Sequence, residues 1–400
     1  MKRSAGILLI ITGFCLLLYN SLFAQKVENK DGVRIVHNEK TGKWGNNPRV
    51  SLEPQGTLGD FDAEDENYMF YLPSDIIEDE KGNRFVLDSG NIRVQKFDPR
   101  GGFLLTFGGE GQGPGEFRLP RNFGMDHSGS ILVTDMANRR IEIFAQDGKL
   151  IRSKRLEEHF NEFLVVGEDR FLTSNNDFFF SSDEDNSDKH MDPLYKIRDL
   201  EGNVYSTLGI TEFIEDANTT PGANSSHAAI DEEGNVYLSF QYLNRIEKYT
   251  QDGKLLLKID RPLNYKIKIE KTEVKRFGDG GISVSSGDRN YVSRGIAVDT
   301  KGRIWNITYK RQEKEDERVG MSTSISTNEG VTQKVSGNTD LRETDMFQLE
   351  LFDSEGVLLY TYQLDHFCDA IKIYGDRLYI LDQKRGNQFF VYKIVEKGIN

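Results

Sequence analysis

Six polar residues stand at matching places along this sequence, each directly before a short apolar stretch. Carboxylates and amides held together can bind a hard cation such as Ca²⁺, and an imidazole can transfer a proton. An arginine among them adds a group that recognises carboxylates or phosphates. The six residues are Asp75, Asn122, Glu162, His227, Arg294 and Asp369. What they can do together depends on the elements that position them.

The apolar stretches after these residues belong to a repeated unit. An apolar segment ends in an aspartate and a glycine follows three residues later, at Asp79, Asp126, Asp231 and Asp299. Aspartate can bond its own backbone and glycine accepts a positive φ, so this pattern predicts tight turns. Short alternating segments between frequent turns indicate antiparallel strands. Repetition of such a unit along the chain predicts a β-propeller.

The repeats define six blades, which we expect at residues 73–119, 120–160, 161–210, 225–266, 293–365 and 366–396. The last blade has only three strands of its own. We expect a strand near Arg49 to Leu58 to supply its fourth, because closing the ring in this way removes an exposed strand edge. The predicted fold class is therefore all-β, a six-bladed β-propeller closed by an N-terminal strand. Aligning the innermost strands then places the six polar residues at the mouth of the central tunnel.

Two blades contain a motif with a known counterpart. Asp88-x-x-Asn91-x-Arg93 and Asp135-x-x-Asn138-x-Arg140, with the glycine-rich run that lies between them, resemble NHL repeats. The resemblance covers most of residues 50–396 and is closest to exported, TolB-like six-bladed propellers of Bacteroidetes-type bacteria. Their function is mostly unassigned, so the resemblance implies the fold and leaves the function open. Several six-bladed relatives are hydrolases or lyases that use a metal in the tunnel.

Four features could suggest chemistry and have a simpler structural explanation. The run Gly108–Gly115 lacks the Gly-Lys-Ser/Thr ending of a phosphate loop, so we expect a linker between blades. The Asp–Arg pairs recur in register with the repeat, so we expect them to support the blades. The acidic run Asp183–Asp188 lacks the glycine and closing glutamate of a Ca²⁺ loop. Residues 310–345, rich in charge, Ser and Thr, are expected to form a loop over one face that could take part in recognition.

No complete catalytic set is visible, so no catalytic residue is assigned and an enzyme is the less favoured interpretation. A zinc site would need about three histidines, and only His227 falls in the tunnel column. Asp75, Asn122, Glu162 and Asp369 could together hold Ca²⁺, although no cofactor is required by the sequence. Cys368 is expected to be buried and inert, with neighbouring side chains on opposite faces of an extended segment.

The N-terminus is typical of an export signal. Lys2 and Arg3 precede an apolar run from Ile7 to Leu18, and Ala24 ends the segment. That run is short for a membrane span, so no transmembrane segment is expected in the mature chain. We therefore expect residues 1–24 to be a signal peptide, 25–48 an N-terminal extension, and 49–396 a single propeller domain. Cys368 is then the only cysteine left, so no internal disulfide can form.

The charge of the chain excludes one class of partner. The formal net charge is −13, and removal of residues 1–24, which contain two basic and no acidic residues, makes it −15. Such a surface repels phosphate backbones, so we expect no nucleic-acid partner. The sequence predicts an exported binding or scaffold propeller, in the periplasm or at the cell surface, that recognises a protein, peptide or glycan of the cell envelope. The alternative is a Ca²⁺-type metal-dependent hydrolase or lyase with its site in the tunnel.

Overall fold

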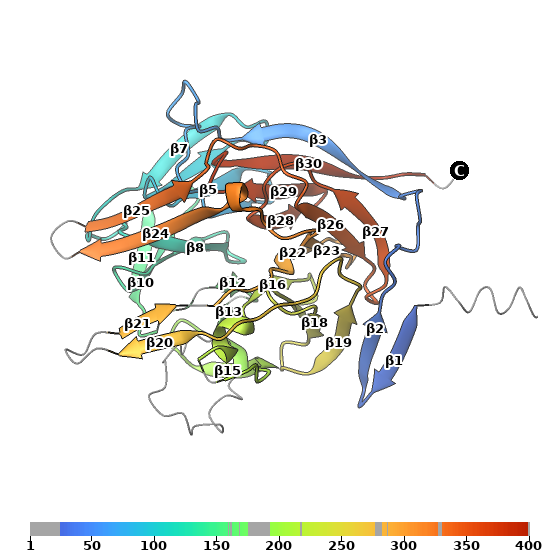
Figure 1. The fold of residues 1–400 in the computed structure, drawn as a ribbon. Coiled ribbons are helices and arrows are strands. Elements are labelled where there is room, and N and C mark those ends of the chain that lie inside the picture. The colour runs from blue at the N-terminus through green and yellow to red at the C-terminus, as the bar shows by residue number, and fades with distance from the viewer. Residues whose placement is uncertain are drawn as a thin grey trace, which may run out of the picture.

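A computed structural model describes residues 25–398, apart from residues 159, 161, 168, 175–192, 217, 277–281, 286 and 327–329. Six sheets of four repeat strands each are arranged around a central axis (Figure 1). The predicted six-bladed β-propeller is confirmed, and the six expected blade ranges contain all the blade strands except the N-terminal strand Val50–Leu58, which joins the last blade.

Each of the first three blades is an antiparallel sheet whose strands follow the chain from the centre outward. Their strands are β4 (Asp75–Glu78), β5 (Arg84–Asp88), β6 (Arg93–Phe97) and β7 (Phe103–Gly108); β8 (Pro120–Met125), β9 (Ile131–Asp135), β10 (Arg140–Phe144) and β11 (Leu150–Arg155); and β12 (Phe163–Val165), β13 (Phe171–Ser174), β14 (Pro193–Arg198) and β15 (Val204–Ile210).

The last three blades add further segments to the same plan. Their strands are β16 (Ser226–Ile230), β17 (Val236–Phe240), β18 (Ile246–Tyr249) and β19 (Leu255–Asp260); β22 (Ser293–Val298), β23 (Ile304–Tyr309), β26 (Phe347–Phe352) and β27 (Leu358–Gln363); and β28 (Ala370–Tyr374), β29 (Arg377–Asp382), β30 (Gln388–Glu396) and β3 (Val50–Leu58). In the described residues, the short helices are α2 (Thr220–Ala223) and the 3-10 turn η2 (Glu315–Glu317).

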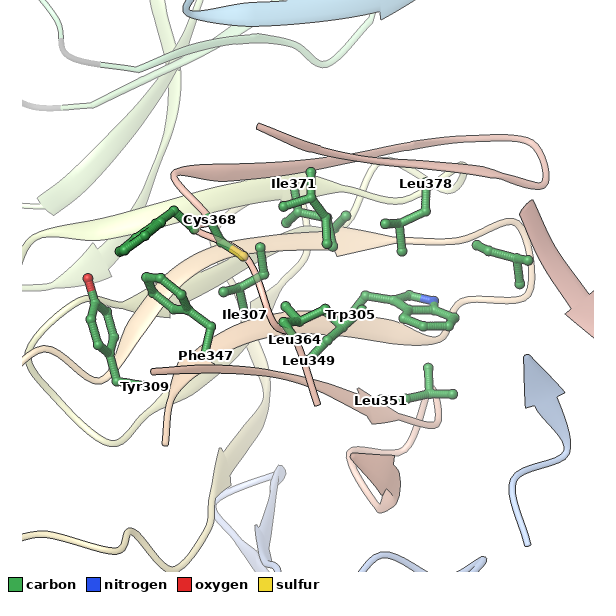
Figure 2. Close-up of a cluster of buried hydrophobic side chains, with 14 of the residues drawn as sticks. Trp305, Ile307, Tyr309, Phe347, Leu349, Leu351, Leu364, Cys368, Ile371 and Leu378 are labelled. Carbon is green, nitrogen blue, oxygen red and sulfur yellow. The ribbon is translucent and has the colours of Figure 1, made fainter. Parts of the chain in front are cut away.

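The second strand of a blade is buried on both faces. Every residue of β9, β17 and β23 is buried, because each blade packs against a neighbour on either side. These strands therefore do not show the apolar–polar alternation of a sheet that has one solvent-exposed face. Between blades five and six, Trp305, Ile307 and Leu349 pack against Ile371 and Leu378 (Figure 2). This packing stabilises the chain without any disulfide.

The N-terminal strand closes the ring as predicted. Strand β3 pairs antiparallel with β30, from Val50 opposite Glu396 to Leu58 opposite Phe389. The last blade thus combines the two ends of the domain in one sheet, and its outer edge belongs to β3.

Residues before β3 attach to two earlier blades. Strand β1 (Lys26–Lys30) pairs with β2 (Val33–His37), and β2 pairs in parallel with β19 of blade four. Farther on, the N–H groups of Lys43 and Trp44 donate to the carbonyl oxygens of Leu358 and Leu359 at the edge of β27. We call Lys26–Trp44 the N-terminal strap. Together with β3, it follows the outside of blades four, five and six.

Two hairpins interrupt the repeat. One consists of β20 (Glu273–Arg276) and β21 (Ile282–Ser285), and the other of β24 (Val319–Ser326) and β25 (Gly330–Gly337). Both extend in the same direction in Figure 1. The prediction of a plain loop at residues 310–345 is therefore wrong: the Ser/Thr- and Val-rich segment alternates in a way that suits paired strands. In the described part of the chain, no helix is long and apolar enough to cross a membrane.

Candidate functional site

The topology gathers the described long connections on one face of the propeller. The inner strands begin at this face, and so do the connections that contain α2, β20–β21 and β24–β25. The opposite face is formed by tight turns such as Asp79–Asn83, where the carboxylate accepts backbone N–H groups two and four residues ahead. We call the first face the insertion face. All six predicted ring residues lie at or next to the inner-strand ends there.

Glu162 and His227 are brought together across blades three and four. Glu162 Oε1 lies 3.6 Å from His227 Nδ1, and Glu162 Oε2 accepts hydrogen bonds from the Tyr195 hydroxyl at 2.8 Å and the Ala228 N–H at 3.1 Å. The other ring nitrogen of His227, Nε2, lies 3.0 Å from the side-chain nitrogen of Gln241. Burial and the charge of Glu162 raise the pKa of Tyr195 well above its usual range, so this hydroxyl remains a donor.

Asp75 lies on the blade-one side of the mouth. Its carboxylate contacts Lys372 Nζ of blade six at 3.1 Å and accepts the N–H of Ile76. Burial raises the pKa of Asp75, Lys372 opposes this, and the negative charge of Glu162 adds to it. Asn122 is turned inward to its own blade, where its side chain donates to Thr134 Oγ1 at 3.1 Å. The negative charge of Glu162 therefore acts on Asp75, whereas the Asn122 side chain is hydrogen-bonded within its own blade.

Arg294 and Asp369 form an ion pair between blades five and six. The Arg294 guanidinium donates to Asp369 at 2.6 Å, and Lys384 Nζ lies 3.4 Å from the same carboxylate. Burial alone would raise the pKa of Asp369, but Lys384 and Arg294 outweigh it and hold the pKa far below the usual range. A small cavity of about 30 Å³ adjoins this pair, and Glu313 of the insertion also lines it. This side of the mouth is a network of alternating charges.

The ring does not form a ready metal site. Within the described ranges, no three His, Cys, Asp or Glu side chains are grouped so that they could hold a metal ion. Asp75 and Asp369 already contact lysine ammonium groups, and the Asn122 amide donates a hydrogen bond to Thr134. A hard cation favours free carboxylate oxygens, so it would have to compete with these lysines. The acidic run Asp183–Asp188, the other Ca²⁺ candidate, lies outside the described residues.

The hairpin β24–β25 is fixed at its base by a charged cluster. Glu317 accepts two hydrogen bonds of 2.6 Å from Arg311 and one of 2.9 Å from the Thr344 hydroxyl. These contacts lower the pKa of Glu317 to about 2, with the Arg311 hydrogen bonds as the largest cause. Farther out, the Tyr71 hydroxyl donates to the carbonyl oxygen of Gln333 at 3.3 Å. The insertion of blade five is thus tied to the loop that leads into blade one.

Sequence reasoning missed an aromatic group on the insertion face. The rings of Tyr242, Tyr291 and Tyr309 follow one another with centroids 5.1 and 5.2 Å apart. The Arg289 guanidinium lies 5.5 Å from the centre of the Tyr242 ring. A signal was present, because blade four lacks the Asp-x-x-Asn-x-Arg motif and continues from its second strand into Tyr242. Lys372 and Lys384 were missed as well, because Lys372 contacts Asp75 from another blade and Lys384 contacts Asp369 from the connection after β29 of the same blade.

The Asp–Arg motif supports the blades, but with different partners in each. Arg93 Nε donates to Asp88 at 2.8 Å, as predicted. Arg140 does not pair with Asp135; its charged partner is Glu142 at 2.6 Å. Asp135 instead accepts backbone N–H groups of the preceding linker. The pairing differs because a buried glutamate two residues after Arg140 competes for the guanidinium.

The glycine-rich run is a linker, not a phosphate loop. Arg140 donates to the carbonyl oxygens of Gln112 and Gly113, and the Asn138 amide donates to that of Gly111. The run therefore turns carbonyl oxygens toward a cation. A phosphate loop needs the reverse, backbone N–H groups directed at an anion.

Cys368 is buried, as predicted. Figure 2 shows its sulfur among apolar side chains, and only 1% of the residue is exposed. One detail of the prediction is wrong: residues two apart share a face of an extended segment, so Cys368 Sγ lies 3.6 Å from His366 Nδ1. Burial raises the pKa of the Cys368 thiol well above its usual range and lowers that of His366. The pair is therefore held neutral.

Comparisons with known proteins agree with this architecture. A family model described as "6-bladed beta-propeller" matches residues 68–313. A solved structure of a DUF4221-family member from Bacteroides vulgatus is 12% identical, with a TM-score of 0.58 over 87% of this chain and 98% of that one. A Bacteroides fragilis protein described as exported is 11% identical, with a TM-score of 0.55 over 91% of this chain and all of that one.

Curated relatives match only in part. NHL repeat-containing protein 3 of Homo sapiens is 28% identical over 81 residues, which is 20% of this chain and 23% of the relative. Across the first three such relatives the matched part spans 4–23% of their length. The likeness therefore supports NHL-type repeats and the fold.

Proposed function

Because this chain belongs to the 6-bladed beta-propeller family, we propose that it is an exported binding propeller that recognises a protein, peptide or glycan of the cell envelope on the insertion face. The observation that supports this most is the asymmetry of the two faces. The hairpins β20–β21 and β24–β25, the helix α2 and the polar ring all lie on one face, while the other consists of tight turns. Recognition residues on rigid scaffolds are commonly carried by such long connections.

The chemistry of the mouth suits binding better than bond cleavage. Glu162, Asp75 and Asp369 are each engaged by a hydroxyl or an ammonium group, so they are preorganised to receive polar groups of a ligand. The neighbouring rings of Tyr242 and Tyr291, whose centroids are 5.1 Å apart, add apolar surface beside them. Such a combination of aromatic faces and fixed polar groups is typical of binding sites. The description of a structural relative as exported supports a place in the periplasm or at the cell surface.

The test compares charge removal at the two faces. Residues 25–400 would be screened on glycan and peptide arrays as the wild type and as the Asp75→Asn/Glu162→Gln variant. The control variant, Glu232→Gln/Glu355→Gln, removes the same charge from turns of the opposite face, where both side chains are exposed. We expect array ligands to bind the wild type and the control and to bind the ring variant at least about tenfold more weakly, which is about 1.4 kcal/mol. Equal binding by all three proteins would place recognition elsewhere.

One observation favours the alternative function. Burial raises the pKa of Asp75, the negative charge of Glu162 adds to this, and a bound cation would offset both effects. In a Ca²⁺-dependent hydrolase or lyase these two carboxylates would be the first ligands. Purified protein that retains stoichiometric Ca²⁺ after dialysis, loses it in the Asp75→Asn/Glu162→Gln variant and shows chelator-sensitive ester or lactone turnover would establish that alternative over simple binding.

A further inference from the structure

A second concave region lies away from the tunnel, between the outer parts of blades five and six. It is a groove of about 1000 Å³. Tyr360 and Tyr362 of β27 form one wall, and Val50 and Leu52 of β3 form the other. Unlike the tunnel mouth, the groove is lined by none of the six ring residues. The two strands give the groove aromatic and aliphatic walls, which suit the side chains of a peptide, whereas the side formed by residues 310–317 and 343–345 is mostly charged.

The strand β27 has a free edge beside this groove. Leu349 is opposite Tyr362 and Leu351 is opposite Tyr360 in its pairing with β26. The N–H of Leu364 donates to the carbonyl oxygen of Phe347, the next pair in this register. Hydrogen-bonded pairs alternate in an antiparallel ladder, so Tyr360 and Tyr362 bond to β26. Thr361, which lies between the two tyrosines, and Gln363 therefore direct their N–H and C=O groups away from β26, toward the free edge.

The chain already uses this edge to hold an extended segment. The Trp44 N–H of the N-terminal strap donates to the carbonyl oxygen of Leu359, the outward-facing residue that precedes Thr361 in the alternation. Strand β2 adds to β19 of blade four, and β3 adds to β30 of blade six. The strap pairs with only the first part of β27. The remaining stretch, four residues long from Tyr360 to Gln363, has room for about 13 Å of extended chain.

The free stretch also lacks the usual protection against strand addition. Tyr360–Gln363 contains no charge, no proline and no glycine, and its tyrosines and threonine favour extended structure. The neighbouring edge strand β3 has Glu53, Pro54 and a register shift between Pro54 and Thr57. The outer strand β11 has Arg152, Lys154 and Arg155, whereas β7 and β15 lack charges and prolines as β27 does, so β27 differs from them by the groove beside it. Such charges, prolines and bulges are the devices that keep edges from pairing.

We propose that the groove between blades five and six binds an extended peptide segment, which adds as a strand to the free half of β27. Its main chain bonds to Thr361 and Gln363, and its alternate side chains enter the groove between Tyr362 and Leu52. The recognised segment is therefore extended, with an apolar residue at every second position. This is strand addition to an exposed sheet edge, in which main-chain bonds give affinity and pockets select side chains. The site is separate from the ring and does not depend on the function proposed for the insertion face.

The test uses a defined probe, a fluorescent, end-capped octapeptide of alternating Val and Thr with one terminal Lys. Binding would be measured by anisotropy, and hydrogen–deuterium exchange would locate the site. Thr361→Pro removes the outward N–H and leaves the β26 ladder intact, since proline is tolerated at an edge position whose N–H faces solvent. Thr207→Pro in β15 is the matched control, because Thr207 opposite Lys196 is equivalent in register to Thr361 opposite Glu350.

We expect the probe to slow amide exchange at residues 359–363 and not at 204–210. Thr361→Pro should weaken binding at least about tenfold, and Thr207→Pro should leave it unchanged. A probe N-methylated at alternate residues should not bind the wild type, which keeps the proposal testable even if Thr361→Pro unfolds.

Three results would overturn the proposal. One is no binding of the probe, and another is binding of the N-methylated probe as tightly as the unmethylated one. The third is slower amide exchange at residues 359–363 with a glycan, chitohexaose, but not with the peptide. The Asp75→Asn/Glu162→Gln variant should bind the probe normally. Loss of array ligands in that variant with normal probe binding would separate the two sites, so either proposal can fail alone.

Discussion

Replacement of Glu317 by glutamine should loosen the hairpin that overhangs the insertion face. The Glu317 side chain is 5% exposed and accepts two hydrogen bonds from the Arg311 guanidinium. In Glu317→Gln the carboxylate charge is lost, and Arg311 retains Asp345, whose side chain is 68% exposed, as its charged partner. The hydrogen bonds from Thr344 and from the Lys314 backbone are weakened too, because a neutral amide oxygen accepts less strongly.

The magnitude follows from the pKa of the carboxyl group. A fall from 4.5 to about 2 corresponds to about 3 kcal/mol at ~1.4 kcal/mol per pKa unit. Arg311 is 24% exposed and partly screened by water, so we expect a loss of about 2 kcal/mol. The pKa is depressed in the folded state, so this stabilisation is fully present above about pH 4.5. It is lost as the pH falls toward about 2.

Hydrogen–deuterium exchange is the direct assay. Backbone amides of residues 319–337 should exchange about thirtyfold faster in Glu317→Gln at pH 7, while amides of β9 remain unchanged. The wild type should approach the behaviour of the variant as the pH falls from 4.5 to 3. Glu315→Gln is the control, because Glu315 lies in the same turn with an exposed side chain. If both variants exchange alike, or if the wild type shows no acid-dependent loosening, the role assigned to Glu317 is incorrect.

Two further predictions concern buried groups between the blades. Arg261 is 2% exposed and donates to Glu350 at 2.7 Å and to Asn244 at 2.8 Å. Arg261→Met should lower the free energy of unfolding, measured in urea, by about 3–5 kcal/mol, because it leaves the buried Glu350 carboxylate without its cationic partner. Arg261→Met/Glu350→Leu should recover most of that loss, and a double variant no more stable than the single one would contradict this. The Cys368 thiol should resist iodoacetamide at pH 8 in the folded protein and react after unfolding in urea, because burial raises its pKa and the thiolate is the nucleophile. Rapid labelling of the folded chain would show that the thiol is accessible and ionised.

The fold was accessible from the sequence because each of its determinants is local. An aspartate with a glycine three residues later forms the same turn at Asp79 and Asp126, and both carboxylates cap the backbone within four residues. Apolar segments between such turns have one way to bury themselves, which is against the next repeat. The missing fourth strand of the last blade likewise predicted a partner near the N-terminus, and β3 is that partner.

The insertions were not accessible in the same way. The hairpin β24–β25 has no repeat to compare with, and its Ser- and Thr-rich composition suits a loop as well as a strand. Its position depends on the pair of Arg311 and Glu317 just before it and on Tyr71, which comes from a distant part of the chain. The N-terminal strap was missed for a related reason, because its pairing with β19 and β27 joins residues more than two hundred positions apart.

The sequence by itself determined the blades, their number and the residues at the start of each inner strand, because turn chemistry and strand burial act over a few residues. Only the tertiary structure decided which of those residues meet: Glu162 with His227, and Arg294 with Asp369, while Asn122 turns into its own blade. It also decided which charges are neutralised: Lys372 of blade six contacts Asp75 of blade one, and Lys384, after β29, contacts Asp369, which precedes β28. Pairing between blades depends on how the repeats curve into a ring. That curvature is a property of the packed core and is not encoded in any single repeat.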